Sequence, residues 1–292
     1  MPDTILSSAS EEVVIGCDHP FVVIGERINP TGRTQLTSEM ESGNFDRVEL
    51  DALAQIAAGA KVLDVNTGVP MADEPALMAK VVELVQSVTS VPISIDSSMP
   101  DALEAGLAAY QGKALVNSVT GEDERLDTVL PIVAKHGAAV VAICHDDSGI
   151  SNDPDKRIEA AKKIIERAAD YGIPVVDVVL DPVVMPIGAA GESGRAVFEV
   201  IRRAHQELRV NTVCGASNVS FGLPDRRQLN AVFLSMMVGY GLTAAIVNPL
   251  HDEVMAAVSG AEVLTGQDRM CKRWIKRSRT RQEPLLDQVS SV

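Results

Sequence analysis

The sequence predicts an α/β protein built as a single (β/α)8 TIM barrel, and three observations lead to this fold class. Short apolar runs alternate with helical segments about every 30 residues, and eight such units fit into the 292 residues. The runs are β-branched and lack polar alternation, which is typical of strands buried on both faces of a parallel sheet. A barrel of this kind takes about 250 residues. An open doubly wound sheet is less favoured, because no dinucleotide-binding glycine fingerprint follows the first run.

Eight apolar runs are the predicted strands, and segments with helical spacing separate them. The strands are expected at residues 21–25, 62–66, 92–96, 114–118, 138–144, 175–181, 211–215 and 243–248. The clearest helical segments are 44–60, 73–90, 153–174, 193–208 and 226–241. Acidic residues open the second of these, which suits the positive end of a helix dipole. Gly172 and Pro174 end the third in a common stop arrangement.

Composition and charge limit the classes of partner. Hydrophobic residues make up 46% of the chain, which is ample for a large core, and the net charge of −14 argues against a nucleic-acid partner. The basic residues are unevenly placed, because residues 269–281 hold seven of the 26 Lys and Arg. We therefore divide the chain into a barrel, residues 1–268, and a basic C-terminal tail, residues 269–292.

The cysteines and the N-terminal segment predict a cytoplasmic protein. The four cysteines are widely separated and form no CxxC pair, so a disulfide framework and a zinc ribbon are disfavoured. The N-terminus lacks a basic region followed by an apolar core, the pattern of a secretory signal. No apolar run approaches the roughly 20 residues that cross a bilayer, and we expect no membrane partner.

Every predicted strand ends in a carboxylate, an amide or an imidazole. In a barrel of this type the active site lies at the carboxyl ends of the strands, so these groups should surround one site. Burying such groups without partners costs about 1–3 kcal/mol each, which indicates that they hydrogen-bond a ligand. The residues, in chain order, are Glu26, Asn29, Asp64, Asn66, Asp96, Asn117, His145, Asp146, Asp181, Asn218 and Asn248.

The chemistry of this ring suits a flat heterocycle rich in N–H donors. It contains carboxylates and amides but few cations, whereas a phosphate site calls for a glycine loop with Lys or Arg. The run "CHDD" at residues 144–147 is the one candidate for a metal site, and we interpret it as a hydrogen-bonded loop. We therefore expect no protein-bound metal.

Six motifs in order carry a family resemblance from about residue 20 to residue 260. They are "VIGERINPTGR" (23–33), "LDVNTG" (63–68), "ISIDSS" (93–98), "LVNSVTGE" (115–122), "LDP" (180–182) and "GASNVSFGLPDRR" (215–227). Together they resemble the methyltetrahydrofolate:corrinoid methyltransferases, which include the folate domain of cobalamin-dependent methionine synthase. The dihydropteroate synthases share the fold and the pterin pocket, but "GERINP" after the first strand favours methyl transfer.

The resemblance implies roles for the residues that match its motifs. Asp96, Asn117 and Asp181 would hold the edges of the pterin ring, and Gly215 and Ser217 would line its pocket. Asn218 would be the catalytic residue, donating a hydrogen bond near N5, the nitrogen that carries the methyl group. Arg226 would support Asn218 or bind the folate tail. The polar floor would be completed, either by orienting these groups or by direct ligand contact, by Glu26, Asn29, Asp64 and Asn66.

The reaction that the resemblance implies is methyl transfer between N5 of methyltetrahydrofolate and the cobalt of a corrinoid, in either direction. Methyltetrahydrofolate or tetrahydrofolate would be the substrate. The corrinoid (cobalamin) would arrive on a partner protein, because a barrel core packed with side chains leaves no room for it. We also expect a homodimer.

Two other functions stay open at this point. One is a pterin enzyme of the dihydropteroate synthase kind, and the other is a non-catalytic barrel that docks a corrinoid protein. The basic tail also has two interpretations. In the first, it is a helix, anchored by Trp274 and Ile275, that covers the barrel or forms an oligomer contact. In the second, it is a docking site for an acidic corrinoid partner.

Overall fold

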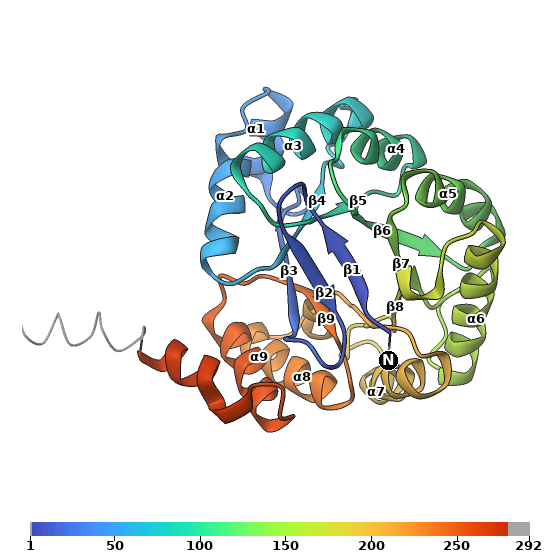
Figure 1. Ribbon diagram of the computed structural model, residues 1–292, viewed down its shortest axis with the longest axis vertical. Coiled ribbons are helices and arrows are strands. Elements are labelled where there is room, and N and C mark those ends of the chain that lie inside the picture. The colour runs from blue at the N-terminus through green and yellow to red at the C-terminus, as the bar shows by residue number, and fades with distance from the viewer. Residues whose placement is uncertain (1, 280–292) are drawn as a thin grey trace, which may run out of the picture.

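A curled parallel sheet forms the centre of the molecule (Figure 1). The computed structural model describes residues 2–279. The sheet has seven strands in the order β8-β7-β6-β5-β4-β3-β9, and neighbouring strands run parallel. All seven coincide with predicted strands: β3 (Val22–Ile28), β4 (Val62–Asn66), β5 (Ile93–Asp96), β6 (Leu115–Thr120), β7 (Ala139–Ile143), β8 (Val178–Asp181) and β9 (Ala244–Val247).

The predicted strand at residues 211–215 is wrong as a regular strand. This segment makes single bridges, from Thr212 to Leu180 of β8 and from Gly215 to Ile246 of β9. The Thr212 amide donates to Thr243 Oγ1 at 2.9 Å, so a side chain takes the place of a ladder partner. The segment still lies between the two edge strands, and its backbone is hydrogen-bonded to both.

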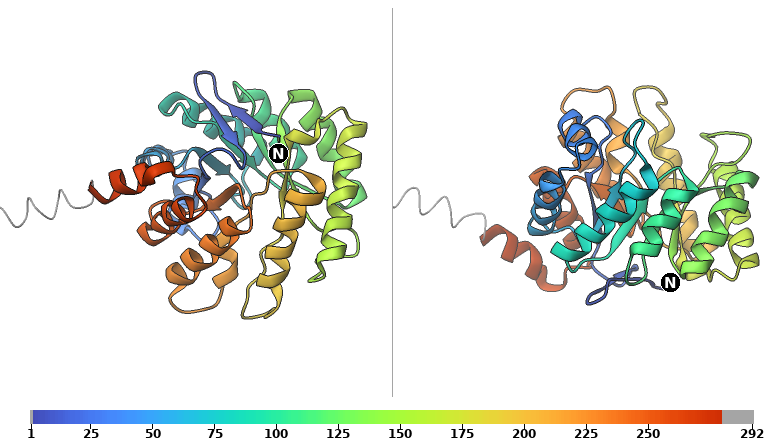
Figure 2. Two further views of the ribbon diagram at one scale, coloured as in Figure 1. Left: turned by 60° about the horizontal axis from the view of Figure 1, so that its bottom comes forward. Right: turned by 90° about the horizontal axis from the view of Figure 1, so that it is seen from above.

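Helices cover the outer face of the sheet (Figures 1 and 2). The five segments predicted to be helical contain α2 (Asp46–Ala57), α3 (Glu74–Val88), α6 (Pro154–Asp170), α7 (Ser193–Arg203) and α8 (Arg226–Gly239). A π-helical turn, η2 (Ala204–Leu208), continues α7, and the 3-10 turn η1 (Val175–Asp177) replaces the first residues of the strand predicted at 175–181. The remaining elements are α1 (Thr34–Glu41), α4 (Pro100–Ala109), α5 (Asp123–His136), η3 (Ala216–Ser220), α9 (Asp252–Leu264) and η4 (Arg269–Cys271).

An N-terminal hairpin, absent from the sequence prediction, lies across the amino ends of the sheet (Figure 2). It consists of β1 (Thr4–Ser7) and β2 (Glu12–Ile15), paired antiparallel. Leu6 and Ile15 are fully buried and cluster with Val22, Ile24 and other side chains inside the curled sheet. The hairpin therefore closes the amino end of the core with apolar side chains.

The basic segment after α9 packs on that helix. Residues 272–279 are helical, and Arg273 pairs with Glu262 at 3.0 Å while Arg277 pairs with Asp252. The Trp274 ring lies against Gly260 of α9. Part of the segment's charge is thus used within the chain, as the covering-helix interpretation requires. The rest of the predicted tail, residues 280–292, lies outside the described residues.

None of the helices within residues 2–279 combines the length and the apolar character that crossing a membrane requires.

Candidate functional site

The register of three adjacent strands brings carboxylates and amides together at the carboxyl end of the sheet. Asn66 of β4 lies opposite Asp96 of β5, and Asp96 lies opposite Asn117 of β6. Asn66 Nδ2 donates to Asp96 Oδ2 at 3.0 Å, and Asn117 Nδ2 donates to Asp64 Oδ1 at 3.1 Å. Ser94 Oγ also donates to Asp64 Oδ1, at 2.7 Å. We call these five residues the carboxylate–amide cluster.

The two carboxyl groups of this cluster are unequal. Burial raises the pKa of Asp64 to about 6, although the hydrogen bonds from Ser94 and Asn117 oppose the rise. Burial and then the negative charge of Asp64 raise the pKa of Asp96 well above its usual range. Two neighbouring carboxyl groups without a cation cannot both ionise easily, so Asp96 holds its proton more tightly than Asp64. Asn66 and Asn117 supply one N–H donor each, and further N–H groups of a ligand would stabilise the ionised form of this pair.

Glu26 extends the acidic character onto β3. Burial raises the pKa of Glu26 to about 7, and the Asp64 carboxylate adds to this rise, while Arg27 and Arg226 oppose it. A carboxyl group with a pKa near neutrality exchanges protons readily at physiological pH. Glu26 is therefore able to hold or release a proton beside the carboxylate–amide cluster.

Asp181, at the end of β8, forms a second acidic position. Its Oδ1 accepts a hydrogen bond from the Val183 amide at 2.7 Å, which fixes the carboxyl group. Burial raises its pKa to about 7, although the Val183 amide and the charge of Arg157 oppose the rise. Arg157 Nη1 donates to the carbonyl oxygens of Pro182 and Val183 at 2.6 and 2.9 Å, and so holds the loop that follows β8.

The 3-10 turn η3 presents the small polar residues of the last motif. The Asn218 side chain is exposed, and a methyl group at Gly215 would come within 3.3 Å of Asn218 Nδ2. Arg226, the first residue of α8, donates from Nε to Ser220 Oγ at 3.0 Å and from Nη2 to the Ser217 carbonyl at 3.1 Å. Arg226 thereby supports the turn that carries Asn218, one of the roles the sequence suggested for it.

The other predicted strand-end residues serve local structure. Asn29 Oδ1 accepts from the Thr31 amide at 2.9 Å, and Asn248 Oδ1 accepts from the Leu250 amide at 3.0 Å. Asp146 Oδ1 accepts from the amide and hydroxyl of Ser148 at 2.9 and 2.7 Å, so "CHDD" belongs to a hydrogen-bonded loop, as predicted. Within residues 2–279, no three His, Cys, Asp or Glu side chains converge as metal ligands.

Two contributors escaped the sequence analysis. Ser94 lies two residues before Asp96 within β5 and orients Asp64, but a serine inside an apolar run carries no signal of its own. Arg157 lies in α6 and is only 1% exposed, which is unusual for an arginine. Its signal was present, because it occupies an apolar position of α6, in line with Ala161, Ile164 and Ala168.

Comparisons with known proteins agree on one family. The family model described as pterin binding enzyme matches residues 25–248. A methylcorrinoid:tetrahydrofolate methyltransferase from Eubacterium limosum is 30% identical over 264 residues, which cover 88% of this chain and 95% of that protein.

Solved structures with the same fold include dihydropteroate synthases. The enzyme from Xanthomonas albilineans with 4-aminobenzoic acid has a TM-score of 0.69 at 20% identity and covers 89% of this chain and 98% of its own. The enzyme from Yersinia pestis with a pterine-sulfa conjugate has a TM-score of 0.67 at 18% identity, with the same coverage of both chains. At these identities the likeness concerns the fold.

Proposed function

The chain belongs to the pterin binding enzyme family as a methyltransferase, and from this premise we propose that it moves a methyl group between N5 of methyltetrahydrofolate and the cobalt of a protein-bound corrinoid. The observation that carries the proposal is the carboxylate–amide cluster. Its carboxyl groups lie on adjacent strands, Asp64 buried and Asp96 partly buried, and form no ion pair with the described residues, so N–H donors of a ligand would complete them. A pterin ring has such donors along one edge.

Each part of the site takes a separate role in this proposal. Asp96, Asn117 and Asp181 hold the pterin edges, with Asp64 and Asn66 orienting them. Gly215 lets the ring approach the backbone, because a larger residue there would crowd Asn218. Asn218 donates to N5, and Arg226 keeps the turn in place through Ser217 and Ser220.

The methyl transfer needs a donor near N5. In the direction from folate to cobalt, the N5–methyl bond breaks and its electron pair stays on N5, while Co(I) supplies the pair for the new Co–methyl bond. The reaction also takes up one proton at N5. A neutral amide such as Asn218 stabilises the charge that develops there, and Glu26, with a pKa of about 7, supplies a route for the proton through the polar network.

Exposed apolar side chains on the loops after the strands support a protein-bound corrinoid. Five of these loops, each between a strand or turn and the helix that follows it, carry an exposed large apolar residue. These loops share the carboxyl end of the sheet, and exposed apolar side chains at one end of a protein suit a protein-interaction surface. The residues are Met71, Met99, Ile150, Phe221 and Leu250. The corrinoid protein would dock here and bring its cobalt to N5.

We further propose that residues 211–215 complete the eighth strand position of a closed barrel, residues 1–268, with residues 269–292 as an appended basic segment. The hydrogen bonds from this segment to both edge strands support closure. Closure would enclose the pterin between Asp181 on one side of the gap and the β3–β5 carboxyl groups on the other.

Two assays test the proposal on the full-length protein. Calorimetric titration with tetrahydrofolate should show binding without added metal. Single-turnover mixing of methyltetrahydrofolate with free cob(I)alamin, followed by the loss of the Co(I) absorption, should show enzyme-dependent methyl transfer. Folded protein that binds no folate at millimolar concentration would contradict the pterin site itself.

A dihydropteroate synthase assay separates the nearest alternative. Formation of dihydropteroate from 4-aminobenzoate and a pterin pyrophosphate, without methyl transfer to cobalt, would assign the chain to that activity. Folate binding with neither activity would favour a docking subunit.

A further inference from the structure

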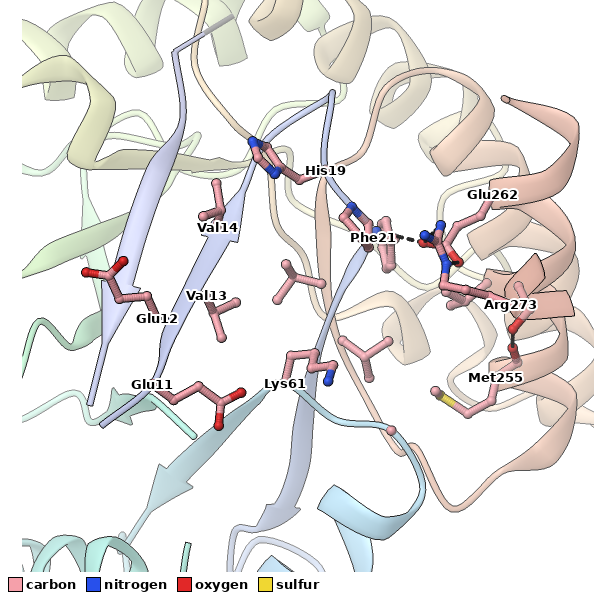
Figure 3. A pocket seen from close by; sticks show the side chains of 16 residues that line it. Glu11, Glu12, Val13, Val14, His19, Phe21, Lys61, Met255, Glu262 and Arg273 are labelled. Carbon is pink, nitrogen blue, oxygen red and sulfur yellow. Dashed lines mark hydrogen bonds and ion pairs between the residues drawn. The ribbon is translucent and has the colours of Figure 1, made fainter. Parts of the chain in front are cut away.

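A cavity, seen from close by in Figure 3, is lined by residues at the amino end of the sheet, opposite the carboxylate–amide cluster. Its volume is about 380 Å³, within the range of small-molecule sites. Four parts of the chain far apart in sequence enclose it: the strand β2, the start of β3, the α2–β4 connection and the outer helices α9 and 272–279. The cavity is therefore distinct from the proposed folate site.

The inner wall of this cavity is apolar. The side chains of Val13, Phe21, Val23, Met255 and Val258 contribute to it, and each is less than 10% exposed. Such a wall favours a ligand with an aliphatic or aromatic group, because that group leaves water on binding.

The rim of the cavity carries opposite charges that do not contact one another. Lys61 and Glu11 both line the cavity, and Figure 3 shows the Glu11 carboxylate on the side of the cavity that faces Lys61. Among the described residues 2–279, Lys61 Nζ makes no hydrogen bond or ion pair, and therefore no direct pair with Glu11. Glu11 Oε2 is held by Ser90 Oγ at 2.8 Å.

Of the other two acids in the lining, the exposed Glu12 directs its carboxylate away from Lys61 (Figure 3), and Glu262 is paired with the second cation. Glu262 is 6% exposed, accepts from the Phe21 amide at 2.9 Å and pairs with Arg273 at 3.0 Å (Figure 3). Arg273 comes from the basic segment of the sequence, which thus supplies one wall of the cavity. Lys61 and Glu11 remain as the groups available to a ligand.

We propose that this cavity binds a small zwitterion with an apolar side chain, an apolar α-amino acid. The ligand carboxylate pairs with Lys61, its ammonium pairs with Glu11, and its side chain rests on the apolar wall. A simple anion would meet the repulsion of Glu11, and a simple cation that of Lys61. A zwitterion fills the gap between the two charges without either repulsion.

Titration of the full-length protein with L-leucine tests the proposal. Calorimetry should show saturable binding at millimolar concentration or tighter. The analogue 4-methylpentanoate, which lacks the ammonium group, and isopentylamine, which lacks the carboxylate, should each bind about tenfold more weakly. Equal binding of all three compounds, or no binding of L-leucine up to about 20 mM (weaker than about −2.3 kcal/mol), would overturn the assignment.

Two exposed or partly exposed positions supply the variants. Lys61→Gln and Glu11→Gln should each weaken L-leucine binding about tenfold, because each removes one charged partner. Lys156→Gln, at an exposed lysine of α6, is the matched control and should leave binding unchanged. Tetrahydrofolate titration of the same samples reports whether the other end of the protein is intact. Retained L-leucine affinity in both cavity variants would also reject the proposal.

Discussion

Polar side chains at the two ends of the sheet differ in whether they find charged or hydrogen-bonding partners within the chain. At the amino end, Asn211 Nδ2 donates to the carbonyl oxygens of Pro2 and Ile15 and to Thr4 Oγ1, at 2.8–3.2 Å. Lys113 and Asp177 pair there at 2.5 Å. At the carboxyl end, the acids Glu26, Asp64, Asp96 and Asp181 form no ion pair with any of residues 2–279, and burial raises the pKa of each of them.

This difference in partners distinguishes polar groups that stabilise the fold from polar groups that a ligand would pair with. A buried amide or charge whose partners lie within the chain adds to stability. Buried carboxyl groups without cations lower the stability of the unliganded protein, and that cost is tolerated where a ligand restores the missing partners. Substitutions at the two ends should therefore affect different measurable quantities.

The largest effect is expected for Asn218→Ala. Loss of a preorganised donor to a developing charge should lower the methyl-transfer rate about 10²–10³-fold, while folate affinity falls tenfold at most. Single-turnover kinetics and equilibrium titration measure the two quantities. Asn152→Ala, at another exposed asparagine of a loop after a strand, is the control. A small and equal fall in rate and affinity would make Asn218 a binding residue.

Asp96→Asn should weaken folate binding by about 1.5–3 kcal/mol, because N–H groups of the ligand favour the ionised carboxyl group and the variant loses this charge-assisted hydrogen bond while keeping the side-chain shape. Calorimetric titration measures the change. Asp101→Asn, at an exposed acid in the first turn of α4, should have no effect. An unchanged affinity in Asp96→Asn would remove this carboxyl group from the pocket.

Asn211→Ala should show the reverse pattern at the amino end. It leaves the Pro2 and Ile15 carbonyls without their donor, which should cost about 1–3 kcal/mol of unfolding free energy. Urea denaturation measures this cost, and folate affinity should stay within twofold (~0.4 kcal/mol) of the parent. A large loss of affinity with intact stability would show that the two ends are not independent.

The stability of the unliganded protein should also depend on pH. The carboxyl groups of Glu26 and Asp181 have a pKa of about 7 in the folded chain, against about 4 when unfolded. Between these values the folded state binds more protons, so unfolding free energy falls as pH rises from about 4 to 7 and the loss is complete above pH 7.

Thermal unfolding of the unliganded protein at pH 5–8 checks this sign. One such group contributes at most about 1.4 kcal/mol per pH unit, or roughly 2–4 °C in Tm. Asp181→Asn should reduce the fall of Tm with pH, because the amide does not titrate. An identical pH profile in the parent and in this variant would refute the raised pKa of Asp181.

Much of the fold and the site was predictable from local pattern. Seven of the predicted strands occur where apolar runs indicated them, and the polar residues at their ends include the whole carboxylate–amide cluster except Ser94. Strand and helix periodicity are properties of neighbouring residues, and parallel strands present their carboxyl ends on one side. The sequence by itself thus determined which residues reach that side.

Contacts between distant parts of the chain were decided only by the tertiary structure. The register of β4, β5 and β6 placed Asp64 beside Asp96 and so made their pKa values unequal. Packing also placed the hairpin β1–β2 across the amino end, Arg157 under the β8 loop, and Lys61 and Glu11 in the lining of one cavity. These outcomes depend on through-space burial and charge, which arise from side chains up to two hundred residues apart and leave no periodic trace in the sequence.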